Sequence, residues 1–322
     1  MAERRLDAIA RFDVENGVAV ACMSDWPTPE PDAERGYRWI HLDLADTGLL
    51  PWARAHLPEI AASALVQSET RPRCERLDEG LILNLRGVNL NPESDPEDMV
   101  SVRLWVTRSG IVSARKRKVF AVDAIREAAA AGRAPSSVGR FLAELSYGLT
   151  SRIENITLAL EEQTDALEDG LSDGRDLRAA ELGSLRQTVI KLRRFLNPQR
   201  EALAALAALE NWIIEPEDLA LLRETANRTR RIVEELDATR DRLSALQDHI
   251  EADRALALGR NSYVLSVIAA IFLPLGFLTG LFGVNVAGMP GVAEPSAFWV
   301  LSGVSVAVGA VLFFVFKWAK WL

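Results

Sequence analysis

The residues best suited to chemistry stand at the end of a long uncharged stretch, where the chain reads Gly283-Val284-Asn285. An amide oxygen is a hard, neutral ligand that replaces or hydrogen-bonds the water around a divalent cation. Several copies of Asn285 meeting at one point would therefore form a ring suited to a hydrated cation. The alternative is that Asn285 only caps the end of a helix.

Small residues recur on one helical face just before this motif. Gly276 and Gly280 form a small-xxx-small pair, and Ala269 and Leu273 extend the same face. Such a face either widens a pore and exposes backbone carbonyls, or lets two membrane helices pack closely. The sequence leaves both interpretations open.

Polar side chains flank this face on both sides. Ser262 and Ser266 either line the inner end of a pore or bond to the carbonyls of their own helix. Asp248 and His249 precede them. Carboxylate and imidazole both suit zinc, and histidine titrates near neutral pH, but a solvated helix face explains them equally well. In an oligomer, several copies of Glu294 would attract cations to the mouth of a pore. The alternative is that Glu294 only keeps the turn soluble.

Two uncharged segments must position these groups. Residues 261–293 contain no charged side chain, and 21 of them, 262–282, are nearly all apolar or small. That length crosses a bilayer core of roughly 30 Å. A second run, 297–316, adds 20 uncharged residues after a turn-rich segment. We therefore predict an integral membrane protein with spans at 261–284 and 297–317, a loop at 285–296 and a tail at 318–322.

The distribution of basic residues predicts the orientation of these spans. Arg254 and Arg260 precede the first span, Lys317 and Lys320 follow the second, and the loop between them has no Lys or Arg. By the positive-inside rule both termini face the cytoplasm and the loop lies outside. The N-terminus lacks the apolar core of a secretory signal. The expected location is the inner (plasma) membrane, with multiple spans.

The chain before the spans changes from mixed to helical character. Residues 1–118 predict an α/β domain, with helices within 49–66 and alternating or apolar strands at 17–22, 38–44, 81–88, 99–106 and 111–115. Residues 119–216 are helical in period. Pro216 opens a last helix, with a stalk at 217–260 that runs into the first span. Its heptad positions predict a seam with partner helices: Leu222, Thr229, Leu236, Leu243, Ile250 and Ala257.

Composition excludes several functions. The net charge of -8 argues against nucleic acid as a partner. Cys22 and Cys74 fit neither a metal motif nor a disulfide framework, so we expect reduced thiols. The sequence has no nucleophile elbow, phosphate loop or paired-carboxylate motif in a recognisable context, so we do not expect an enzyme or a prosthetic group.

Residues 274–285 (PLGFLTGLFGVN) resemble the signature of the CorA-type divalent metal ion transporters, which have two spans and a Gly-x-Asn motif. The magnesium branch of that family usually has Gly-Met-Asn. Here Gly-Val-Asn is followed by Gly288-Met289-Pro290-Gly291, which resembles the zinc branch, the ZntB transporters. Segments 71–74, 86–92, 96–101 and 320–322 resemble that branch as well, so the resemblance covers essentially the whole chain.

The resemblance implies a funnel-shaped homopentamer. Two spans in one protomer cannot enclose a water-filled path, which agrees with an oligomer. The α/β domain would be a sheet layered with helices, the long helix would form the funnel wall, and the first span would line the pore. Gly283, Val284 and Asn285 would form the external mouth. Asp248 falls where the magnesium branch tends to have an acidic residue bordering the pore, whereas Gly276 replaces a hydroxyl that the family usually carries.

The function implied is transport of a divalent cation, most specifically zinc, coupled to protons. The zinc assignment depends on the resemblance, because the first span has no Cys or His. The same span has no Asp, Glu, Lys or Arg either, so any coupling would use the funnel, or water and hydroxide that pass with the ion. The alternatives are a passive channel for magnesium or other divalent cations, and a membrane-anchored scaffold or signalling protein.

Overall fold

The computed structural model describes residues 6–24, 26, 36–78, 80–173, 179–209, 213–284, 289, 291 and 294–319. The chain divides into two compact units, Met1–Leu246 and Gln247–Leu322. The first unit contains the sheet and most of the helical residues. The second contains the last part of the longest helix and one further helix.

In the described part of the first unit, seven strands form one mixed sheet in the order β2-β1-β3-β7-β6-β5-β4. The strands β3 and β7 run parallel, and all other neighbours are antiparallel. The strand bounds are β1 Ala10–Glu15, β2 Val18–Ala21, β3 Gly36–Asp43, β4 Arg73–Leu77, β5 Gly80–Gly87, β6 Val100–Val106 and β7 Gly110–Arg115. The helix bounds are α1 Leu49–His56, α2 Glu59–Val66, α3 Phe120–Ala130, α4 Val138–Ser172, α5 Ala179–Ala207, α6 Pro216–Gly283 and α7 Ala297–Trp318.

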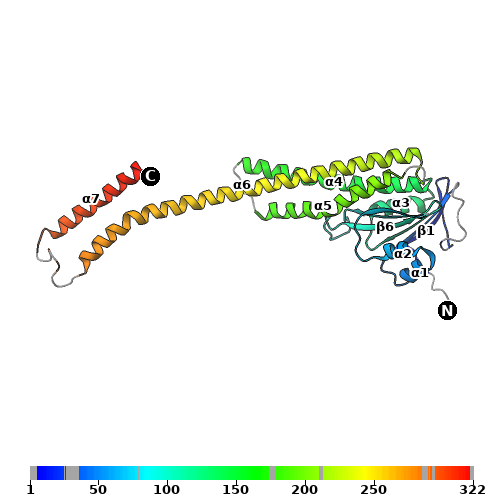
Figure 1. Ribbon diagram of the computed structural model, residues 1–322, viewed down its shortest axis with the longest axis horizontal. Helices are drawn as coiled ribbons and strands as arrows, with labels where there is room; N and C mark the ends of the chain where they lie inside the picture. Colours follow the sequence, from blue (N-terminus) through cyan, green and yellow to red (C-terminus); the bar gives the residue numbers. More distant parts are fainter. Residues whose placement is uncertain are drawn as a thin grey trace. The chain divides into compact units, whose positions relative to one another are not determined.

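Helices cover both faces of this sheet, as Figure 1 shows. Because side chains alternate along a strand, Leu81, Leu83 and Leu85 of β5 join a core with residues of α3, α4 and α5. Ile82, on the other face, joins a second core with residues of α1 and α2. The expected α/β layering of the N-terminal region is therefore confirmed.

The sequence prediction missed two of the strands, β1 and β4. In β1 only Phe12 and Val14 are buried, and they alternate with the charged residues Arg11, Asp13 and Glu15. The edge strand β4 reads RCERL and has no buried residue. Neither has an apolar run of the kind that the sequence shows at the five predicted strands. The five predicted strands and the helices within 49–66 are confirmed to within two residues.

The first half of α6 packs against α4 and α5 of the same chain. The heptad residues Leu222, Thr229, Leu236 and Leu243 are buried. The Thr150 and Thr229 hydroxyl oxygens lie 3.1 Å apart, and Arg242 Nε donates to Glu168 Oε1 at 2.8 Å. The partner helices of this part of the seam are thus intramolecular. Further along, Ile250 is half-buried and Ala257 is exposed.

A buried histidine closes a hydrogen-bond network between β3 and β7. Arg115 Nε donates to His41 Nε2 at 3.1 Å, so the proton of the neutral ring is on Nδ1, 2.8 Å from Ser113 Oγ. Trp39 Nε1 donates to the same hydroxyl oxygen at 2.8 Å, and that hydroxyl donates to the Ile40 carbonyl. Burial, together with the Arg115 charge, lowers the pKa of His41 to about 3.

This network predicts a pH-dependent stability. Between the unfolded pKa of about 6.5 and the folded pKa, the unfolded chain binds more protons, so stability falls as the pH falls below about 6.5. We expect a loss of about 2 kcal/mol between pH 7 and pH 5 from this group. His41→Gln should remove that slope even if it lowers stability at both values. Urea unfolding followed by tryptophan fluorescence measures it, and an unchanged slope in the variant would contradict the assignment.

Candidate functional site

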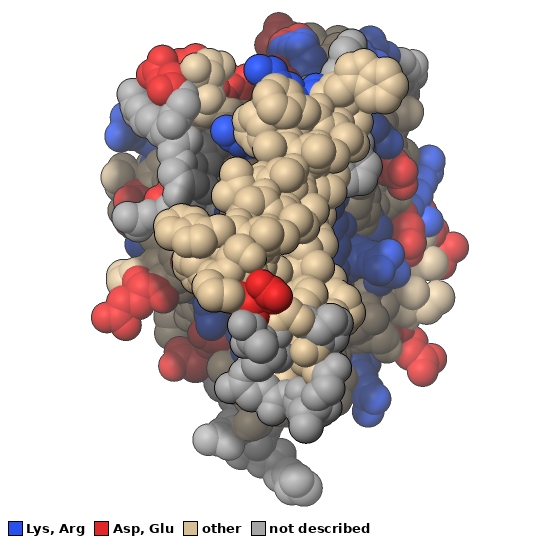
Figure 2. All heavy atoms as spheres, turned by 90° about the vertical axis from the view of Figure 1, so that its left-hand side faces the viewer, with Lys and Arg blue, Asp and Glu red and all other residues tan. Residues whose placement is uncertain are grey.

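The second unit contains two helical segments long and apolar enough to cross a membrane, the end of α6 and α7. Only 6% of the apolar window in α6 and 0% of that in α7 is buried within the protomer. The apolar core helix of a soluble protein would be mostly buried, so that explanation does not fit. The tan band in Figure 2 shows this surface, which has almost no acidic or basic side chains. Its natural environment is a bilayer or other copies of the chain.

One face of the α6 span packs against α7. Val267 is buried, and Leu275 comes within contact distance of Gly309 of α7. Leu278 and Phe282 line a cavity of about 680 Å³ together with Val304 of α7. At about 100° per residue these α6 side chains share one side of the helix, so α7 determines which side of α6 is left open.

The predicted pore residues share the opposite side. At 100° per residue, Ser262, Ser266, Leu273, Gly276 and Gly280 fall within about 40° of one direction, away from α7. All five are exposed, and 74% of the Leu273 surface is accessible. A Cβ added at Gly276 or Gly280 would meet nothing within 4 Å. Within one protomer this face is therefore an open stripe of small and polar residues, interrupted by Leu273.

The hydroxyls of the span bond to their own helix. Ser266 Oγ donates to the Ser262 carbonyl at 2.9 Å, and Thr279 Oγ1 donates to the Leu275 carbonyl at 3.0 Å. The back-bonding alternative is thus observed for Ser266. Because a hydroxyl oxygen keeps lone pairs after it donates its proton, Ser266 still presents an acceptor on the open face.

The outer end of α6 is described only as far as Val284. Gly283 ends the helix and Val284 is exposed, whereas Asn285 lies outside the described residues. Glu294 is exposed and lines the same cavity as Phe282. The Glu294 carboxylate of the loop therefore lies near the outer end of the α6 span.

Asp248 and His249 lie on different sides of α6. By helical period Asp248 is about 40° from the direction of Ser262, whereas His249 is about 140° away. His249 Nε2 instead lies 3.5 Å from Asp253 Oδ2, one turn along the helix. The sequence prediction missed Asp253, although an i,i+4 acid–base pair is a readable signal. The described residues contain no group of three or more His, Cys, Asp or Glu that could hold a metal.

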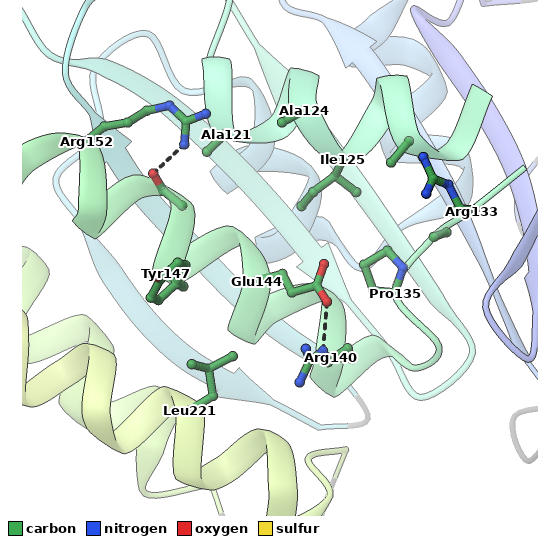
Figure 3. A pocket seen from close by; sticks show the side chains of 13 residues that line it. Ala121, Ala124, Ile125, Arg133, Pro135, Arg140, Glu144, Tyr147, Arg152 and Leu221 are labelled. Carbon is green, nitrogen blue, oxygen red and sulfur yellow. Dashed lines mark hydrogen bonds and ion pairs between the residues drawn. The ribbon is translucent and has the colours of Figure 1, made fainter. Parts of the chain in front are cut away.

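A cavity of about 830 Å³ in the first unit does not offer a metal site either. It lies beside α3 and α4 and is lined by several alanines and by Arg133, Arg140 and Arg152 (Figure 3). Arg140 Nε donates to Glu144 Oε1 at 2.7 Å, and Glu144 is the one carboxylate among the described lining residues. The lining of this cavity is mainly positively charged, which does not favour the binding of cations.

The fold and the open stripe define a class: membrane proteins in which two helices follow a large α/β and helical region. The chain matches the family described as CorA-like Mg2+ transporter protein over residues 34–318. It therefore belongs to the CorA-like family of divalent cation transporters. Members of this family are ion transporters rather than enzymes, and no prosthetic group is indicated.

Similar proteins agree with this membership. The chain is 35% identical over 287 residues to a zinc transport protein ZntB of Pectobacterium atrosepticum, covering 88% of each chain. It is 36% identical over 292 residues to a divalent cation transporter CmaX of Pseudomonas aeruginosa, covering 88% of this chain and 87% of that one. A structure of full-length CmaX superposes with a TM-score of 0.80 at 32% identity and covers 98% of both chains. The membership decides against the scaffold alternative.

Proposed function

We propose that this protein transports zinc across the inner membrane as a homopentamer whose pore is lined by the open face of α6. The observation that supports this most is the alignment of Ser262, Ser266, Leu273, Gly276 and Gly280 on the side of α6 opposite α7. One protomer leaves this face exposed, with serines at its inner end and glycines further out. Converging copies of the same face would enclose a path for an ion.

In this proposal each group along the path has a role. Asn285 supplies a ring of amide oxygens at the external mouth, next to Gly283 and Val284. Glu294 raises the local concentration of cations there. Leu273 forms an apolar constriction of the kind that gates by dewetting. Ser262 and Ser266 offer oxygen acceptors at the inner end, and Asp248 faces the cation on the cytoplasmic side.

Zinc as the main substrate is supported by the relatives named for zinc transport and by Gly-Val-Asn in place of Gly-Met-Asn. Proton coupling follows the zinc branch that the chain resembles. Since the first span has no Asp, Glu, His, Lys or Arg, we assign coupling to Asp248 and His249 or to hydroxide and water that move with the ion. Both termini lie in the cytoplasm, in accord with Arg254, Arg260 and Lys317 flanking the spans.

A passive divalent cation channel is the second candidate. The uncharged span favours it, because intramembrane proton relays usually use Asp, Glu or His. The family description and the name of the CmaX relative also leave magnesium and other divalent cations open.

Flux into liposomes that contain the purified protein separates these possibilities. Zinc and magnesium are tested separately, with and without a pH gradient, and with Asn285→Ala beside the natural chain. Zinc flux that responds to the gradient and collapses in the variant supports a proton-coupled zinc transporter. Flux that ignores the gradient indicates a channel. Asp248→Asn and His249→Ala should each weaken the dependence of zinc flux on the pH gradient. If both variants keep this dependence, proton coupling does not use these funnel residues.

A further inference from the structure

A second cavity of the first unit collects positive charge in a protein whose net charge is -8. Its volume is about 480 Å³, and it lies where β5, β6 and β7 approach the middle of α5. Two carboxylates line it, those of Glu97 and Asp98. Six cationic side chains also line it: Arg86, Arg103, Lys116, Arg117, Lys191 and Arg194.

Two of the six cations, Arg86 and Lys191, make close polar contacts with the wall of the cavity. Arg86 donates to the Thr70 carbonyl at 2.9 Å and to the Met99 carbonyl at 2.7 Å, and its guanidinium lies 3.9 Å from the centre of the Phe195 ring. Lys191 lies 3.3 Å from Asp98 and 3.6 Å from Glu97. These contacts occupy both carboxylates and build the wall of the cavity.

The other cations are not neutralised. In the part of the chain that the structure describes, no ion pair joins Lys116, Arg117 or Arg194 to a carboxylate. Arg194 lies over the Phe195 ring at 5.4 Å, a contact that leaves its N–H donors available. The lining carries six positive charges and two negative ones, so an anion among the excess positive charges would relieve their repulsion.

Arg103 is the deepest member of the group. Only 3% of its surface is exposed, and its guanidinium makes two long hydrogen bonds, each 3.3 Å, to the carbonyls of Leu65 and Ser68. Its Nε has no partner among the described residues. Burial, with the Arg86 charge second, lowers its pKa to about 10, so the guanidinium still carries charge at neutral pH.

Two further buried polar side chains near Arg103 and Arg86 lack hydrogen-bond partners among the described residues. Asn84, the register partner of Arg103 on β5, is 2% exposed, and neither atom of its amide is hydrogen-bonded to a described residue. The same holds for the hydroxyl of Thr70, whose carbonyl accepts from Arg86. Buried polar groups are nearly always paired, so the unpaired Nε of Arg103, which lines the cavity, supports a binding site there.

We propose that this cavity binds a phosphorylated small molecule through its phosphate. Arg103, Arg117 and Arg194 present guanidinium forks, which match the geometry of phosphate oxygens. The cavity lies in the size range of small-molecule sites and is far larger than one phosphate. Its walls come from Ser68, Arg86 and segments 97–103, 116–117 and 191–195, so an occupant would contact both α5 and the sheet.

Calorimetric titration of the full-length protein in detergent, free of divalent metal, tests the proposal. The probes are sodium pyrophosphate, inorganic phosphate and AMP. We expect pyrophosphate or AMP to bind with a Kd below about 1 mM, and Arg117→Gln and Arg194→Gln each to weaken that binding about tenfold. Arg108→Gln is the matched control, because it removes one exposed cation at the opposite end of β6.

The outcomes distinguish sources of the phosphate and alternatives to it. Tighter binding of AMP than of both inorganic probes would identify a nucleotide-type ligand, whereas tighter binding of pyrophosphate would identify an inorganic or acyclic one. Equal weakening by all three variants would mean non-specific attraction and would overturn the proposal. So would no binding of any probe. If Arg117→Gln then changed the oligomeric state, an acidic segment of a second copy would be the occupant instead.

Discussion

Gly280→Leu should lower metal flux by at least about tenfold, because copies of a bulky side chain would meet in the pore. In the protomer a Cβ at position 280 meets nothing within 4 Å. Leucine is also a better helix former than glycine by roughly 1 kcal/mol. The protomer itself gives no reason for the substitution to harm the fold. The loss should therefore arise only when the open faces of several copies converge.

Gly303→Leu provides the matched control. Gly303 lies in α7, and a Cβ added there also meets nothing within 4 Å. It carries the same change of volume on α7, outside the face of α6 that we propose lines the pore, so its flux should stay within about twofold of the natural chain. Both variants should elute from size-exclusion chromatography at the same volume, which shows that neither substitution changes the assembly. An equal loss of metal flux in both variants, or full metal flux in Gly280→Leu, would mean that this face of α6 does not line the pore.

The longest helix and four of the five inner strands were predictable because their signals are local. The sequence predicted a stalk at 217–260 that continues into a span at 261–284, and α6 runs Pro216–Gly283, because no helix breaker appears from 217 to 258. The strands β3, β5, β6 and β7 have the apolar runs that a core requires. The strands β1 and β4 lack such a run, and the charged residues of β4 lie at the sheet edge, where it pairs with one strand, β5.

The open face of α6 was predicted from helical period, but the reason that it stays open was not. Period places Gly276 and Gly280 on one side, whereas the packing of Leu275 beside Gly309 determines that α7 covers the other side. The helical period also places His249 and Asp248 on different sides of α6. The sequence prediction overlooked this when it considered the two as neighbouring zinc ligands. The cationic cavity is harder still, because Arg103, Arg117 and Arg194 come from separate elements and share no sequence motif.

Gly36→Ala should destabilise the first unit by about 3 kcal/mol or more. A Cβ at position 36 would lie 2.0 Å from the Val14 carbonyl oxygen and 3.0 Å from the Val14 carbonyl carbon. Gly36 pairs with Glu15 across the β1–β3 ladder. The obstacle is therefore backbone that belongs to the same sheet, and no rotamer change can relieve it.

Gly183→Ala is the control that separates this close approach from a general effect of replacing glycine. Gly183 lies within α5, and a Cβ there meets nothing within 4 Å. Alanine should stabilise the helix by up to about 1 kcal/mol, so the two variants should shift the urea midpoint in opposite directions. Midpoints that move together would show that β1 yields to the methyl group. In that case β1, which only β2 and β3 hold in the sheet, would be a loosely held strand rather than a fixed part of the α/β layer.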